Sequence, residues 1–227
     1  MDLALWRGAY RARDRTRVMA RVFLQGTTIP IYPAPSVNMP LMQPDLFAAP
    51  SPALPGLSLA RNIVTTDEER SLVAAIDGVA LSPFRFHGWI GKRLTVSFGW
   101  KYDFDNASFG PTDPIPGFLH FLRARAAAFA GLAECELVQA ILIRYDPGAG
   151  IGWHRDRDVF NHVIGVSLGT PAIMRFRRRI GTIYKRASAL LEPRSVYHLS
   201  GEARHVWEHS IAPMEQARWS VTFRTLS

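Results

Sequence analysis

The sequence predicts an α+β domain that is mainly β, built as an antiparallel sandwich or jelly roll with two helices packed outside. Three observations predict this class. Two amphipathic helix patterns lie in the first part of the chain, over 65–77 and 116–130. After Gly131 the apolar spacing changes to period two or to short apolar runs. Turn-rich pieces without a helical pattern separate those runs, which argues against βαβ units.

Residues 1–56 are predicted to form a basic, irregular extension that precedes a domain over 57–227. The stretch 30–55 holds eight of the sixteen prolines, too many interruptions for a regular element. Residues 1–21 carry six arginines and two acids. This basic segment has three interpretations: a transit-like segment, an arm that binds nucleic acid, or a spurious upstream extension.

The first helix is expected over 65–77, TTDEERSLVAAID. Thr65 or Thr66 supplies an N-cap hydroxyl, and Glu68 or Glu69 stands three positions later, as a capping box requires. Its apolar face consists of Leu72, Val73 and Ile76.

The second helix is expected over 116–130. Pro116 suits the first turn of a helix, where its missing N–H is not needed. The apolar face consists of Phe118, Leu119, Leu122, Ala126 and Phe129, so we interpret these positions as core.

Six strands are expected in the second half of the chain. Each is a short run of alternating or continuous apolar residues between turn signals. The runs are 136–145, 162–169, 172–179, 195–201, 204–212 and 218–226.

Charge and cysteine content narrow the classes of partner and compartment. Lys and Arg number 27 against 19 Asp and Glu, a formal charge of +8 that fits a polyanion such as nucleic acid, or a basic protein without one. The single cysteine, Cys135, excludes an internal disulfide and a cysteine-based zinc cluster. No apolar stretch approaches the roughly 20 residues of a membrane span. We therefore expect a cytoplasmic protein, monomeric and without a membrane partner.

His154 and Asp156 stand one residue apart in WHRD, and a third ligand would make them a metal site. The other candidates are His162, His198, His205 and His209. Two histidines and one carboxylate on one face of a metal leave three positions open, which suits nonhaem Fe(II) and oxygen chemistry. A zinc hydrolase could use the same ligands.

Arg218 and Arg224 favour the oxygenase interpretation. They are six residues apart, so in a strand they point to one side, together with Ser220 and Thr222. Inside a barrel two unpaired guanidinium groups would need an anion, and a dicarboxylate suits their planar forks. The alternative is an exposed edge strand with both arginines in water.

As a set, these residues resemble the AlkB family of Fe(II)/2-oxoglutarate-dependent dioxygenases. The matching segments are RYDPGAGIGWHRDRD (144–158), LSGEARHVWEHSI (199–211) and RWSVTFR (218–224). The resemblance covers the chain from about Leu57 and is strongest after Ile141. It implies a double-stranded β-helix (jelly roll) core with two or more supporting helices on its N-terminal side.

The resemblance also implies roles for individual residues. Fe(II) would be held by His154, Asp156 and His209. The distal carboxylate of 2-oxoglutarate would be held by Arg218 with Tyr145, and Ser220 can contribute a hydrogen bond. Arg224 would lie by the metal-bound end of the cosubstrate, and Asp158 would face the target base.

Two positions depart from the family. The family commonly has asparagine two residues before the tyrosine that corresponds to Tyr145, where this chain has Ile143. It commonly has another two residues after the arginine that corresponds to Arg218, where this chain has Ser220. Serine can still hydrogen-bond, whereas isoleucine cannot.

Two further segments could contact a nucleic acid. The segment 91–104 resembles the family's nucleotide-recognition lid, where Trp100, Tyr102 and Phe104 could stack on a base and Lys92, Arg93 and Lys101 could contact phosphate. An ordinary amphipathic strand is the alternative. The run 175–179, with Lys185 and Arg186, could follow a phosphate backbone or form a solvated basic hairpin.

The implied reaction uses Fe(II), 2-oxoglutarate as cosubstrate and O2. It removes methyl groups oxidatively from bases such as 1-methyladenine and 3-methylcytosine in DNA, or RNA, releasing formaldehyde, succinate and CO2. The same chemistry on tRNA or protein is the alternative. A catalytically silent barrel that binds nucleic acid is a third.

Overall fold

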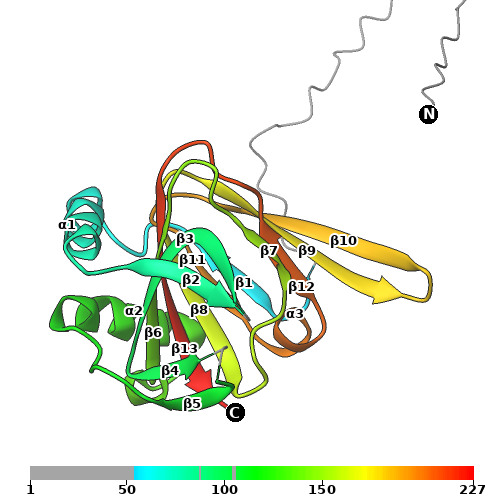
Figure 1. Cartoon of the computed structure of the whole chain (residues 1–227), viewed down its shortest axis with the longest axis horizontal. Helices are drawn as coiled ribbons and strands as arrows, with labels where there is room; N and C mark the ends of the chain where they lie inside the picture. Colours follow the sequence, from blue (N-terminus) through cyan, green and yellow to red (C-terminus); the bar gives the residue numbers. More distant parts are fainter. Residues whose placement is uncertain (1–53, 87, 104–105) are drawn as a thin grey trace, which may run out of the picture. The chain divides into compact units, whose positions relative to one another are not determined.

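The computed structural model describes residues 54–86, 88–103 and 106–227. Most of the predicted extension 1–56 lies outside this range. The described chain contains two main antiparallel sheets that face each other (Figure 1). The larger consists, in spatial order, of β1 (Leu57–Ala60), β11 (Val196–Leu199), β8 (Phe160–Gly169), β13 (Arg218–Leu226), β6 (Gln139–Tyr145), β3 (Trp89–Phe98) and β2 (Ser82–Phe86).

The smaller sheet has four strands, and a separate hairpin completes the β structure. The four are β10 (Ile183–Leu191), β9 (Ala172–Ile180), β12 (Glu208–Ile211) and β7 (Ile151–His154). The hairpin pairs β4 (Trp100–Asp103) with β5 (Ser108–Pro111). Two facing antiparallel sheets with helices outside confirm the predicted jelly-roll class.

The larger sheet separates two hydrophobic cores. Val221 and Phe223 of β13 pack in the core that also contains the helix residues Leu72 and Leu122. The second core contains Tyr145, on β6 of the larger sheet, with residues of the smaller sheet such as Phe176 and Ile211. Side chains of β13 alternate between the faces of the sheet, so Arg218 and Arg224 lie on the face opposite Val221 and Phe223.

The first predicted helix is confirmed as α1 (Thr66–Asp77). Thr65 is its N-cap: the Thr65 hydroxyl accepts from the Glu68 amide at 3.2 Å, and the Glu68 carboxylate accepts from the Thr65 amide at 2.8 Å. Leu72 and Ile76 are buried, and Val73 packs against the same core.

The second predicted helix is confirmed as a 3-10 turn, η1 (Gly117–Leu119), that continues into α2 (His120–Ala130). It ends at Gly131, whose φ of 69° is a left-handed conformation that glycine adopts without a Cβ clash. Within the described chain, no helix has the length and apolar character that a membrane span requires.

The prediction of a strand over 204–212 is wrong in its first half. A short helix, α3 (Gly201–His205), comes first, and β12 begins only at Glu208. Arg204 and Trp207 are buried while His205 between them is exposed, so the chain uses the i, i+3 spacing of a helix here in place of period two. Another short helix, η2 (Glu134–Glu136), precedes β6 where the strand was expected to start at residue 136.

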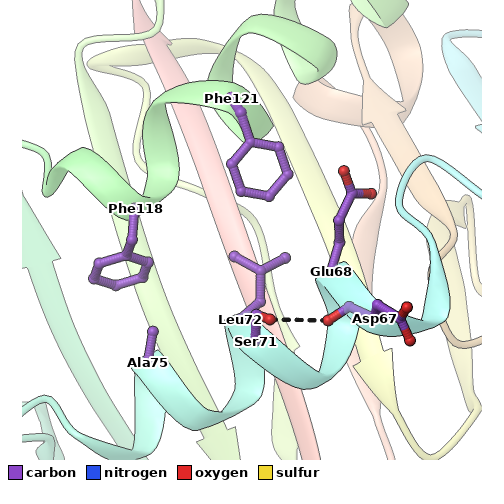
Figure 2. Close-up of a pocket in the computed structure, with 7 residues that line it drawn as sticks. All are labelled: Asp67, Glu68, Ser71, Leu72, Ala75, Phe118 and Phe121. Atoms are coloured by element: carbon purple, nitrogen blue, oxygen red, sulfur yellow. Dashed lines mark hydrogen bonds between the residues drawn. The ribbon is translucent and has the colours of Figure 1, made fainter.

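A groove of about 390 Å³ lies between α1 and α2 (Figure 2). Leu72, Phe118 and Phe121 form its apolar walls. The Glu68 carboxylate at its rim accepts two hydrogen bonds of 2.8 Å from Arg125, so its charge is paired. The groove lies on the helical side of the larger sheet, whereas His154, Asp156 and His209 lie between the two sheets.

Candidate metal centre

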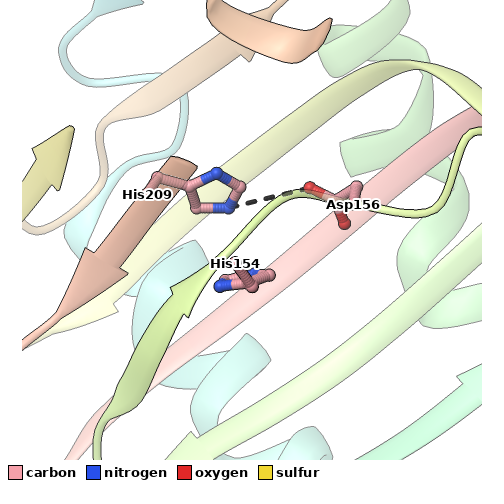
Figure 3. A group of neighbouring side chains, drawn as sticks. All are labelled: His154, Asp156 and His209. Atoms are coloured by element: carbon pink, nitrogen blue, oxygen red, sulfur yellow. Dashed lines mark ion pairs between the residues drawn. The ribbon is translucent and has the colours of Figure 1, made fainter. Parts of the chain in front are cut away.

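His154, Asp156 and His209 meet between the two sheets. His154 is the last residue of β7, Asp156 follows it in a loop, and His209 lies on β12, where it is the cross-strand partner of His154. One potential ligand atom from each residue lies within 4.8 Å of the others, and the three side chains point toward a common space (Figure 3). The predicted grouping of these residues is therefore present in the structure.

Nearby oxygen atoms indicate which ring nitrogen of each imidazole faces the common space. Nδ1 of His154 lies 2.9 Å from the Gly152 carbonyl, which can only accept, so Nδ1 carries the proton and Nε2 keeps its lone pair. Nε2 of His209 lies 3.7 Å from Asp156 Oδ2. Both Nε2 atoms are thus the ligand atoms that this geometry offers.

The ionisation of the group suits a divalent cation. Burial lowers the pKa of His154, and burial followed by the neighbouring His154 lowers the pKa of His209 to about 3. Burial of Asp156 opposes its ionisation, but Arg224 and then His209 outweigh this and hold its pKa below the usual range. At neutral pH the three residues present two neutral imidazoles and one carboxylate. This is the donor set of a mononuclear Fe(II) site with open positions.

Arg224 links the metal group to the larger sheet. Its Nη2 donates to Asp156 Oδ1, and its Nη1 donates to Gln139 Oε1 at 3.0 Å. Gln139 is the cross-strand partner of Arg224 on β6.

Arg218 is a buried cation with unused donors. It is 1% exposed, and its Nη2 donates to Ser167 Oγ at 3.1 Å. Its Nε and Nη1 have no hydrogen-bond partner among the described residues. Its guanidinium lies 5.2 Å from the ring centre of Tyr145, which is its cross-strand partner on β6. Ser220, also buried, lies between the two arginines on the same face of β13. A buried guanidinium with free N–H groups fits a carboxylate ligand.

Two further arginines lie in this interior. Arg93, for which a phosphate contact was expected from the sequence, is only 7% exposed and lies 3.8 Å from the ring centre of Phe84. Arg204 is 2% exposed at the end of α3. Burial lowers the pKa of both guanidinium groups. The interior is therefore rich in cations beside a single buried carboxylate among the described residues, that of Asp156.

The residues expected to contact a base lie on the β4–β5 hairpin and on the loop after β7. Trp100 stacks on Phe109 with ring centres 5.0 Å apart, and Tyr102 lies 4.4 Å from the Arg157 guanidinium. Asp158 is exposed, next to Arg157. Since Phe109 also packs edge-on against Phe160 at 5.6 Å, the hairpin contacts the loop that follows Asp156. Phe104, also expected to stack, lies outside the described residues.

Gln139 and Ser167 are site residues that the sequence did not suggest. Each becomes recognisable only from strand register, because Gln139 lies opposite Arg224 and Ser167 lies opposite Ser220. Ile143, where the family often has asparagine, is the partner of Ser220 on β6, across from Ser167 on β8. It packs against the second core.

Comparisons with known proteins agree with this geometry. Residues 88–224 match the model of the 2OG-Fe(II) oxygenase superfamily. The dioxygenase AlkB of Escherichia coli (strain K12) is 28% identical over 212 residues, which cover 79% of this chain and 96% of AlkB. The tRNA (carboxymethyluridine(34)-5-O)-methyltransferase alkbh8 of Xenopus tropicalis is 28% identical over 169 residues, or 72% of this chain and 26% of alkbh8.

One more relative and one solved structure extend the comparison. The alkylated DNA repair protein ALKBH8 homologue of Arabidopsis thaliana is 30% identical over 184 residues, or 70% of this chain and 51% of that protein. The chain thus spans about half of this relative and a smaller part of the Xenopus protein. The solved structure of OsALKBH1 shares the fold, with a TM-score of 0.60 at 16% identity, and the match covers 75% of this chain and 97% of that one. The chain belongs to the AlkB family of the 2OG-Fe(II) oxygenase superfamily, whose members use Fe(II), 2-oxoglutarate and O2.

Proposed function

We propose that His154, Asp156 and His209 hold Fe(II), and that Arg218 anchors 2-oxoglutarate beside it. The observation that carries this proposal is the pairing of a neutral-imidazole and carboxylate donor set with a buried arginine whose Nε and Nη1 lack partners. Bound Fe(II), with 2-oxoglutarate and O2, supplies the oxidising power to hydroxylate a C–H bond.

The residues of the chain would supply position and charge. Arg218 would receive the distal carboxylate of the cosubstrate with Tyr145 and Ser220, each of which can donate a hydroxyl hydrogen bond. Arg224 fixes the Asp156 carboxylate and would lie by the metal-bound end of the cosubstrate. Burial of these groups keeps water away and strengthens their electrostatic interactions.

For the substrate we propose N-alkylated bases of the 1-methyladenine and 3-methylcytosine type in DNA, or RNA. Hydroxylation of the N-methyl group would release formaldehyde and restore the base. AlkB and a relative named an alkylated DNA repair protein support this class. Three relatives named tRNA methyltransferases favour tRNA as the second candidate. A monomeric, cytoplasmic enzyme stays an expectation from the composition.

Trp100, Tyr102 and Asp158 are the proposed base contacts. The β4–β5 hairpin contacts the segment after Asp156 through the Tyr102–Arg157 and Phe109–Phe160 pairs, so the hairpin borders the chain that leads away from this metal ligand. An aromatic ring at this border offers a stacking surface to an extruded base.

The test incubates purified protein with Fe(II), 2-oxoglutarate and ascorbate, and with oligonucleotides containing 1-methyladenine in DNA or in RNA. We expect succinate to accumulate and the modified strand to lose the mass of one CH2 unit, because a hydrogen replaces the methyl group. An unmodified strand and the H154A variant are the controls. Succinate without any change in strand mass would refute nucleic-acid repair while keeping the oxygenase.

The strands β9 and β10 form a basic hairpin that would contact the phosphate backbone. Residues 172–191 contain six Lys and Arg and no acid. Arg177 and Arg178 pair with Glu208 and Glu202, but Arg175, Arg179, Lys185 and Arg186 are exposed and form no ion pair with a described residue. Exposed cations whose charge is not paired suit a polyanion.

The triple variant R179Q/K185Q/R186Q tests this surface. Each phosphate contact to a single strand contributes about 0.7 to the slope of log affinity against log salt, so we expect the slope to fall by about 2. The control R61Q/R70Q/R125Q removes the same charge from arginines that pair with Glu192, Asp67 and Glu68. Equal slopes for both variants, measured by fluorescence anisotropy across salt concentrations, would contradict the role of the hairpin.

A further inference from the structure

Helix α3 is joined to the 155–160 segment, which contains Asp156, by hydrogen bonds from two arginines. One arginine lies on the helix and donates to the segment, and the other lies on the segment and donates to the helix. Nη2 of Arg204 donates to the carbonyl oxygens of Arg157 and Phe160, each at 2.5 Å. In return, Nη1 of Arg155 donates to the His205 carbonyl at 2.9 Å. We call these three hydrogen bonds the α3 clasp.

The two carbonyl oxygens that accept from Arg204 belong to the first and last residues of a tight turn. The Phe160 amide donates to the Arg157 carbonyl at 3.0 Å, so one guanidinium nitrogen bridges both ends of this turn. Asp156 directly precedes it. Holding the turn therefore limits where the Asp156 carboxylate can lie.

The other end of the clasp leads to His209. Arg204 lies in the last turn of α3, and the chain runs directly from that helix into β12, which carries His209. The clasp thus connects two residues of the metal group that are more than fifty positions apart in the sequence.

The burial of Arg204 argues that this connection has a function. The residue is 2% exposed, and its Nε and Nη1 have no hydrogen-bond partner among the described residues. An arginine kept in the interior with unsatisfied donors is unfavourable for stability, and an apolar side chain of similar volume would pack there without that penalty. The buried guanidinium does, however, donate two hydrogen bonds to the turn that follows Asp156.

We propose that Arg204 is a positioning residue of the metal centre, which holds Asp156 in place relative to His209. This inference rests on the metal centre proposed above. Residues that orient metal ligands in this way change metal affinity by about 10- to 100-fold when they are replaced.

The test measures binding of Co(II), a spectroscopic substitute for Fe(II), by its visible absorption in the full-length protein. R204M removes the hydrogen bonds and the charge, and we expect Co(II) affinity to fall about 10- to 100-fold. R204K keeps the charge but loses the planar fork, so an intermediate loss is expected. With iron at saturation, the KM for 2-oxoglutarate stays unchanged, because Arg204 does not contact the proposed cosubstrate anchors.

R178M is the matched control. Arg178 holds α3 from another side, through a 3.2 Å hydrogen bond to Glu202 and a 5.4 Å approach to the Trp207 ring. Its replacement loosens α3 without breaking the clasp, so the urea midpoint falls while Co(II) affinity stays at the wild-type value.

Three results would overturn the proposal. The first is wild-type Co(II) affinity in folded R204M; if R204M does not fold, wild-type affinity in R204K overturns it instead. The second is an equal loss in R178M, which would reduce Arg204 to a structural residue. The third is a lack of Co(II) binding by the wild-type protein, which would overturn the proposed metal centre and, with it, the role of Arg204.

Discussion

Replacing His154 with alanine is expected to abolish the turnover of 2-oxoglutarate while the protein stays folded. Changes in residues that only support metal ligands lower activity by about 10- to 100-fold, so loss of a ligand lowers it by more than about 100-fold. His154 makes one local hydrogen bond, to Gly152, and its removal leaves the Asp156–Arg224 pair intact. We therefore expect the same urea midpoint for the metal-free variant and the wild type.

Asp156→Ala is expected to affect both activity and stability, whereas His154→Ala affects activity alone. It also abolishes turnover, but it leaves Arg224 without its carboxylate, and breaking a buried pair costs about 3 kcal/mol of folding free energy. The control is H205A, because His205 is exposed and lies outside the group of three. Succinate formation and Co(II) binding are the measurements. Near-normal turnover in H154A would refute the ligand assignment.

The local motifs of the metal group could be predicted from the sequence because its chemistry is concentrated in few residues. His154 and Asp156 are close in the chain, and the last strand carries both arginines on one face, as period two requires. The spacing of Thr65 and Glu68 likewise identified a helix start that depends only on nearby residues.

The parts that could not be predicted depend on partners distant in sequence. Gln139 and Ser167 join the site only through strand register, which local periodicity does not specify. Strand β10 lacks alternation because much of it is exposed on both faces, and of its residues only Ala189 and Leu191 are buried. The segment 204–207 resembled a strand, but the burial of Arg204 and Trp207, three positions apart, favours a helical turn.

Arg218→Met is expected to weaken 2-oxoglutarate binding without weakening the fold. Removing one partner of a buried, hydrogen-bonded charge pair costs about 2 kcal/mol or more, so KM for 2-oxoglutarate should rise about 30-fold or more. In the protein without cosubstrate, the same change removes a buried guanidinium with two unsatisfied donors, and the interactions lost are the hydrogen bond to Ser167 and the approach to the Tyr145 ring. The free energy of unfolding should therefore stay constant or rise by about 1 kcal/mol.

Arg144→Met is the matched control for the effects of Arg218→Met on the KM for 2-oxoglutarate and on the free energy of unfolding. Arg144 is the strand neighbour of Tyr145 and points to the opposite face of β6, where it pairs with Asp77 and Asp146. Its loss should lower the urea midpoint slightly and leave the KM for 2-oxoglutarate unchanged. Opposite responses of the two variants would show that Arg218 is retained for the cosubstrate at the expense of stability. An unchanged KM in R218M, with succinate formation as the readout, would remove Arg218 from the binding site.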